Sequence, residues 1–164
     1  MKRTLKVSKV FILLVVNMLI FGIIVTNSHS HEIDYDFNST EDFIRAAQGG
    51  DVEAVKLFIK ANMDVNSHNK YGVTPLLAAI MFHNTDVARL LIENGADVNA
   101  KADDGDTPLI FAANGNMVDI VRLLIEHGAD VNAKTDLGES ALMVAQEKGL
   151  MDIVKLLKEA GAKE

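Results

Sequence analysis

The segment RLLIENGADVNAK, residues 89–101, returns 33 residues later as RLLIEHGADVNAK, residues 122–134, with twelve of thirteen positions unchanged. At the same offset, Gly72, Gly105 and Gly138 precede the related stretches VTPLLAA, DTPLIFAA and ESALMVAQ. A weaker copy begins near residue 39 and continues as DVEAVKLFIKANMDVNS, residues 51–67. A period between about 20 and 50 residues predicts stacked units, each of which leans on its neighbours.

These residues resemble the ankyrin repeat: a turn with Gly, then Thr-Pro-Leu, a pair of small residues, a Leu-rich second helix and Gly-Ala-Asp-Val-Asn. The resemblance covers residues 38–164. It implies an all-α solenoid of stacked helix-turn-helix units with projecting β-hairpin loops. We expect about four repeats, at residues 39–70, 71–103, 104–136 and 137–164.

Local signals place the helices inside each unit. Thr74 and Thr107 can cap a helix start, and Pro75 and Pro108 suit the first helical position, where a missing N–H costs nothing. Asn62 stands where later copies have Gly and tolerates the left-handed backbone that ends a helix. Asn99 and Asn132 are expected to hydrogen-bond loop backbone. The positions expected to face inward or to form the apolar stripes are Leu76, Ala79, Val87, Leu90, Leu91, Leu109, Ala112, Ile120, Leu123 and Leu124.

The two ends depart from the pattern in ways that suit caps. In the first unit, Ser39 with Asp42 resembles a capping box and replaces Thr-Pro. In the last unit, Gln146 and Lys158 stand at positions that are apolar in the inner copies. Polar residues there favour a closing unit without a further neighbour.

The first 30 residues are typical of an export signal. Four positive residues precede an apolar run, residues 10–25, that is broken only by Asn17 and Gly22. Its 16 residues slightly exceed a cleavable signal core and fall short of the roughly 20 that span a membrane. We therefore expect either a cleaved signal peptide, with periplasmic or secreted repeats, or an uncleaved anchor. The third alternative, an extra buried helix of the stack, is disfavoured because the run lacks a polar face.

Residues 31–38 are expected to form a linker before the repeat domain, residues 39–164. If cleavage followed Ser28, His31 would be third from a free amine, an arrangement that can bind Cu(II). His29 and His31 lack a rigid scaffold and are more typical of linker residues, so no metal or cofactor is predicted.

Charge and composition exclude several functions. The formal charge is −7, and without residues 1–30 it becomes −11, from 12 basic against 23 acidic residues. Such a surface repels phosphate, so nucleic acid is not an expected partner, and a membrane is met only through an uncleaved N-terminal segment. The chain has no Cys, which removes disulfides and thiolate chemistry.

The repeats carry no recognisable catalytic constellation. His68, His83 and His127 occupy different places in their units, and no HExxH, phosphate-binding loop or Gly-x-Ser-x-Gly occurs. The Asp residues around Gly105 lack the spacing of a calcium loop. We predict no enzyme activity and a monomer.

The resemblance implies binding to a protein through the hairpin tips and the ends of the first helices, which form a concave face. Tyr71, Met81 and Phe82 cluster in one unit. They are candidate anchors because aromatic and Met side chains on an acidic surface supply binding energy. Phe82 packing under the neighbouring hairpin is the alternative to its role as an anchor. The predicted partner-binding residues are Tyr71, Met81, Phe82, Lys70, Asp104, Asp106 and Leu137.

These observations predict a non-catalytic interaction module that acts outside the cytoplasm on an unidentified protein. Two alternatives stay open. The protein could be a secreted effector that binds a host protein, or an accessory, chaperone-like protein that stabilises a periplasmic enzyme.

Overall fold

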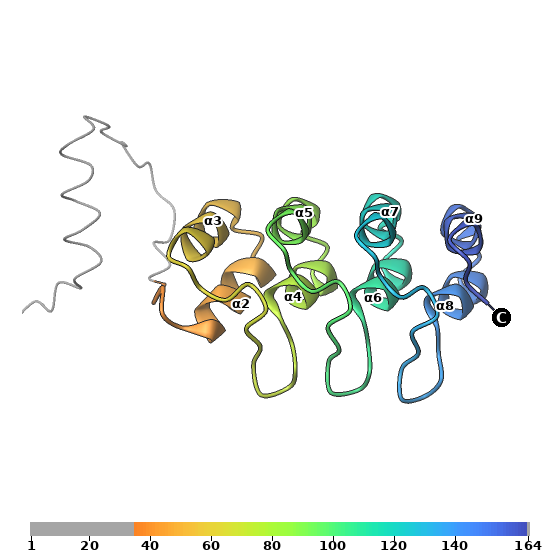
Figure 1. Ribbon diagram of the computed structural model, residues 1–164, viewed down its shortest axis with the longest axis horizontal. Helices are drawn as coiled ribbons and strands as arrows, with labels where there is room; N and C mark the ends of the chain where they lie inside the picture. The colour runs from red at the N-terminus through yellow and green to blue at the C-terminus, as the bar shows by residue number, and fades with distance from the viewer. Residues whose placement is uncertain (1–34, 164) are drawn as a thin grey trace, which may run out of the picture. The chain divides into compact units, whose positions relative to one another are not determined.

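The computed structural model describes residues 35–163, which lie in the second of the two units into which the chain divides, residues 1–34 and 35–164. This part contains eight helices in four antiparallel pairs, which Figure 1 shows as two layers with loops projecting beside the first helices. None of these helices has the length and apolar character needed to cross a membrane. The predicted signal or anchor helix lies outside the described residues. The helices are α2 (Thr40–Gln48), α3 (Val52–Lys60), α4 (Pro75–Met81), α5 (Thr85–Glu93), α6 (Pro108–Asn114), α7 (Val118–Glu126), α8 (Ala141–Glu147) and α9 (Met151–Glu159).

The first helices begin as the sequence predicts. The buried Thr74 and Thr107 hydroxyls accept hydrogen bonds from the backbone N–H groups of the third helical residues, at 3.2 and 3.3 Å. Pro75 and Pro108 occupy the first helical position. Ser140 caps α8 in the same way at 3.3 Å although no proline follows it. A hydroxyl cap is therefore common to α4, α6 and α8, whereas proline follows it only in α4 and α6.

The turns at helix ends use residues that tolerate positive φ. Asn62 has φ 60°, which confirms its prediction as a substitute for Gly. His83 and Asn116 take φ 58° and 54° in the turns between paired helices, where the first and last units have Gly50 and Gly149. The same backbone path is thus kept in all four pairs despite different side chains.

Small and branched apolar residues form the core. Ala46 and Ala47 of α2 are fully buried, as are Ala112 and Ala113 of α6, so neighbouring first helices pack closely. Every position predicted to face inward or to form the stripes is buried or half-buried. The core therefore runs through the stack as a series of contacts between neighbouring pairs, as repeat proteins require.

The prediction of β-hairpin loops was wrong in one respect, because no strand forms within residues 35–163. Each loop is closed near its tip by two backbone bonds, for example from Ala102 N to Asp106 O at 3.0 Å and from Gly105 N to Ala102 O at 2.9 Å. The arms are too short to extend this into a ladder. One isolated bridge, between Lys134 and Ser140, is the remnant of a strand pair in the described part of the chain.

An asparagine in each of three loops joins its unit to the next one. Its side-chain oxygen accepts a hydrogen bond from a backbone N–H about one repeat further on. This confirms that Asn99 and Asn132 hydrogen-bond backbone groups, and it shows that these bonds join neighbouring units. The bonds run from Asp97 N to Asn66 Oδ1 at 2.7 Å, from Asp130 N to Asn99 Oδ1 at 2.7 Å, and from Lys163 N to Asn132 Oδ1 at 2.8 Å.

Residues 35–38, which fall in the predicted linker, pack on the first helix pair. The Phe37 ring lies 4.7 Å from that of Phe58, and Tyr35 meets Phe58 edge-on at 5.8 Å. Phe58 in turn stacks on Phe43 at 4.9 Å. Burial raises the pKa of the Tyr35 hydroxyl, and the Asp51 carboxylate adds to the rise. These aromatic rings cover the open end of the stack.

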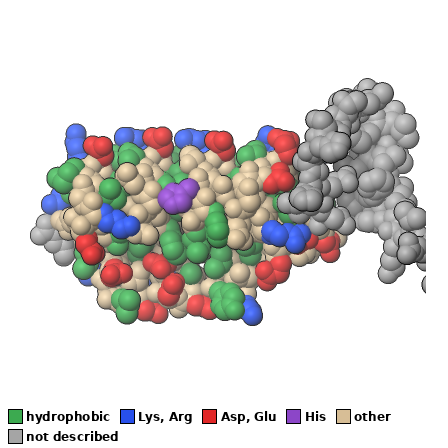
Figure 2. Space-filling model, turned by 180° about the vertical axis from the view of Figure 1, so that it is seen from behind, with side chains coloured by type: hydrophobic (Ala, Val, Ile, Leu, Met, Phe, Trp, Pro, Cys, Tyr) green, Lys and Arg blue, Asp and Glu red, His purple; other side chains and the backbone are tan. Residues whose placement is uncertain are grey.

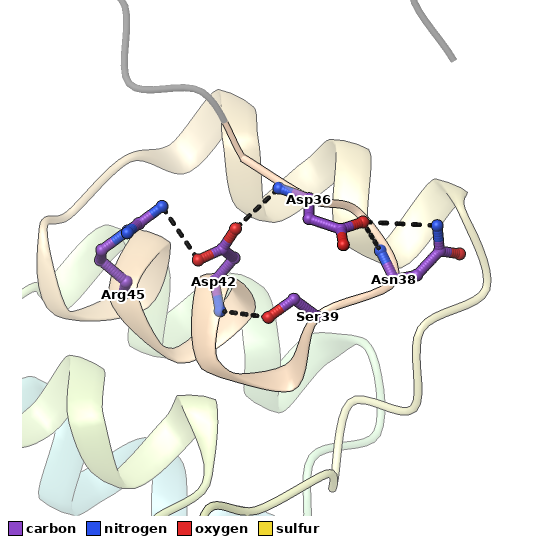
Figure 3. A network of polar contacts seen from close by, with 5 residues as sticks. All are labelled: Asp36, Asn38, Ser39, Asp42 and Arg45. Atoms are coloured by element: carbon purple, nitrogen blue, oxygen red, sulfur yellow. Dashed lines mark hydrogen bonds and ion pairs between the residues drawn. The ribbon is translucent and has the colours of Figure 1, made fainter. Parts of the chain in front are cut away.

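A polar network holds the same segment in place (Figure 3). Ser39 Oγ accepts from Asp42 N at 3.3 Å, which is half of the predicted capping box. The Asp42 carboxylate turns away from Ser39, accepting instead from Asp36 N at 2.7 Å and pairing with Arg45 at 2.9 Å. The Asp42 side chain therefore holds residue 36 against α2 and does not complete the capping box.

Candidate functional site

A hollow of about 210 Å³ lies between the loops of the second and third helix pairs. Its walls come from three places: the loop before α4, the end of α4, and the next loop with α6. The residues that line it are Tyr71, Val73, Met81, Ala102, Asp103, Asp104 and Phe111.

Contacts between successive loops fix the geometry of this hollow. Asp103 N donates a hydrogen bond to Tyr71 O at 3.2 Å, so the two loops lie against one another. Phe111 contributes a large ring where the equivalent positions of α4 and α8 hold Ala78 and Val144. Its size, at a position that holds a smaller side chain in α4 and α8, is the sequence signal that could have identified it.

Exposed apolar side chains surround the hollow. Tyr71 is 57% exposed and Met81 is 42% exposed, although both line it. Phe82, next to Met81 at the end of α4, is 52% exposed, so it is not an ordinary core side chain. Figure 2 shows hydrophobic and acidic side chains intermixed over the lower part of the stack, where the loops project.

Charged groups lie on the same loops. The Lys70 ammonium sits 4.8 Å from the centroid of the Tyr71 ring. Asp104 lines the hollow, and its carboxylate accepts from Asp106 N at 3.3 Å. Partial burial raises the pKa of Asp106 to about 6, with further contributions from Asp104 and Glu139.

The seven predicted binding residues are not all in one place. The structure brings Tyr71, Met81 and Asp104 together around the hollow, with Lys70 on the Tyr71 ring. Asp106, Phe82 and Leu137 do not line it, and Leu137 stands alone on the following loop with 87% of its side chain exposed. The sequence analysis did not select four other residues that line the hollow: Val73, Ala102, Asp103 and Phe111.

Two further hollows, of about 340 and 260 Å³, flank His83 at the turns between paired helices. The His83 imidazole packs against Gly115 of the next pair, and Asn84 donates to Ala47 O and Gln48 O of the preceding pair at 2.9 and 2.8 Å. These contacts join neighbouring units. Between residues 35 and 163 there is no group of three or more His, Asp or Glu side chains that could hold a metal, and His29 and His31 lie outside that range.

Repeated antiparallel helix pairs with loops projecting beside one layer define a helical solenoid, a class of protein that presents an extended binding surface. A family model described as ankyrin repeats (3 copies) matches residues 13–102 and 100–164. The chain therefore belongs to the ankyrin repeat family. Ankyrin repeats indicate a protein–protein interaction module, and the family is generally non-catalytic. A search of curated proteins found no match.

Proposed function

We propose that this protein binds a protein partner through one defined area, the loop–helix surface, which consists of Tyr71, Met81, Phe82, Asp103, Asp104 and Phe111. The observation that carries the proposal is the exposure of three large apolar side chains, Tyr71, Met81 and Phe82, in one repeat and beside a hollow. Exposed aromatic and Met side chains that are grouped in this way mark interaction sites, because their burial by a partner releases ordered water.

Each helix pair acts as one repeat in this proposal, which gives four repeats. The second and third repeats carry the loop–helix surface, while the first and fourth close the ends. Phe37 covers one end, and the exposed Gln146 and Lys158 keep the other end polar. Binding at inner repeats is favourable because both neighbours hold their loops in place.

The repeats act outside the cytoplasm in this proposal. Its support is the positively charged start followed by the apolar run at residues 10–25. Cell fractionation with mass spectrometry of the mature N-terminus tests it. A start between residues 27 and 32 identifies a cleaved signal, and an intact Met1 in membranes identifies an anchor. An intact Met1 in the cytosolic fraction would contradict export.

Site-specific photocross-linking tests the binding surface. A photoreactive phenylalanine analogue is placed at position 82, or at position 89 as a control, since Arg89 is exposed on α5 in the other helix layer. The proposal predicts a discrete cross-linked protein from position 82 in the producing cells, and none of the same mass from position 89. Equal adducts from both positions, or an adduct from position 89 alone, would refute it.

The captured protein then permits a quantitative test. Tyr71→Ala with Phe82→Ala should weaken its binding at least tenfold, which corresponds to about 1.4 kcal/mol. The unfolding free energy should change little, since both side chains are half exposed or more. Met151→Ala is the matched control, because Met151 is 70% exposed at the start of α9. A large loss of stability in the double variant would show that the two rings support the fold instead.

A further inference from the structure

We propose that the hollow between Tyr71, Met81, Asp103, Asp104 and Phe111 receives the side chain of an arginine on the surface of the partner protein. This inference rests on the proposed function and specifies the chemistry of the partner.

The size of the hollow sets the kind of occupant. Sites for small molecules usually enclose about 300–1,000 Å³. The hollow measures about 210 Å³, so it suits one side chain of a docked protein better than a free cofactor or metabolite. It lies between two projecting loops, where a partner's own loop can approach.

The residues that line the hollow have two kinds of chemistry. Tyr71, Met81 and Phe111 are apolar or aromatic, and Asp103 and Asp104 are exposed acidic residues. A side chain with an apolar stem and a cationic head matches both parts. Arginine fits better than lysine because its planar guanidinium stacks on aromatic rings and pairs with carboxylates through two parallel hydrogen bonds.

The surroundings favour a cation as well. The chain places its own Lys70 ammonium over the Tyr71 ring, so this ring already supports a cation–π contact. Lys70 is absent from the lining of the hollow, whereas the acidic residues Asp103 and Asp104 belong to it. Asp106 and Glu139 add negative charge close by, and the exposed Lys101 opposes it. The incoming guanidinium therefore competes with Lys70 for the ring and gains the two carboxylates.

An NMR titration with a minimal probe tests the inference. The full chain carries ¹³C-labelled Met methyl groups, and the Met81 resonance is assigned with Met81→Leu. The probes are N-acetyl-arginine methylamide and its neutral isostere, N-acetyl-citrulline methylamide. We expect a saturable shift of the Met81 methyl resonance with the arginine probe and at least fivefold weaker binding of the citrulline probe. Equal binding of the two probes, or no shift at all, would overturn the inference.

Isosteric variants locate the effect. Asp103→Asn with Asp104→Asn keeps the side-chain oxygen that accepts from Asp106 N and should remove the preference for arginine over citrulline. Glu93→Gln with Glu126→Gln makes the same change in net charge at the exposed ends of α5 and α7 and should keep that preference. If both double variants lose it equally, the attraction is general and the hollow is not the site.

The inference and the proposed function fail separately. If Met81 responds to the arginine probe but position 82 yields no cross-linked protein, the chemistry of the hollow stands and the proposed function is wrong. If position 82 captures a protein whose binding is unchanged by Asp103→Asn with Asp104→Asn, the proposed function stands and the arginine assignment is wrong.

Discussion

A comparison of two glycines tests whether successive loops support one another. Gly105 and Gly138 occupy equivalent loop positions with nearly equal φ values, +81° and +82°. A Cβ atom at Gly105 would lie 2.9 Å from Asp136 N and 3.2 Å from the carbonyl carbon of Thr135, both in the next loop. A Cβ atom at Gly138 would meet nothing within 4 Å. The two sites share the backbone strain and differ in the contact with a neighbour.

The magnitudes follow from these contacts. Alanine in the left-handed region costs about 1–2 kcal/mol, and Gly138→Ala should lose only that. Gly105→Ala must also push the next loop away, which breaks the 3.1 Å hydrogen bond from Asp136 N to Asp104 O. A lost hydrogen bond adds about 0.5–1.5 kcal/mol, so Gly105→Ala should lose about 1.5–3.5 kcal/mol in total.

Equilibrium unfolding in urea, followed by circular dichroism, measures both variants against the parent chain. We expect the unfolding free energy of Gly105→Ala to fall below that of Gly138→Ala by about 1 kcal/mol. Equal losses would show that the loops do not support one another, and so would a larger loss for Gly138→Ala.

Three further predictions use the same unfolding measurement. Asp106→Asn should stabilise the chain at pH 7.5 but not at pH 4. The folded-state pKa of Asp106, about 6, lies above its unfolded value, so the stability of the wild-type chain falls as pH rises between these two values. Allowing for solvent screening, the gain in unfolding free energy is at most about 1 kcal/mol, and a gain independent of pH would contradict the raised pKa. Asn99→Ala removes two bonds to the next unit and should cost about 1–2 kcal/mol, whereas Asn94→Ala removes one bond within its own unit and should cost less; the reverse order would count against coupling between units. Phe37→Ala should cost about 2 kcal/mol, roughly half the value for a fully buried Phe, and an unchanged unfolding curve would show that residues 35–38 do not belong to the fold.

The repeat offset predicted much of the fold because each unit repeats the same local physics. Pro75 and Pro108 mark the helix starts of the two inner copies. Asn62 was recognisable as a left-handed position because the three later copies have Gly there. The predicted loop asparagines could be identified, but not their partners. A bond from Asn99 to the next unit depends on how the units are offset in space, which one copy does not encode.

The end cap and the hollow were harder to predict for a related reason. Tyr35 and Phe37 have no counterpart in later units, so alignment gave no register for them, and their polar surroundings favoured a linker. The hollow arises where the Phe111 ring of one pair meets Tyr71 and Met81 of the preceding pair. The sequence analysis placed Tyr71 and Met81 on one surface, but the Phe111 ring belongs to the next unit.

The loops and first helices of the second and third pairs form the proposed binding surface. Hydrogen–deuterium exchange of the full chain, with and without the protein captured from position 82, tests it most directly. We expect the partner to slow exchange in residues 69–83 and 101–114 and to leave exchange in α5 and α7 unchanged. Slower exchange confined to α5 and α7, with residues 69–83 unaffected, would contradict it.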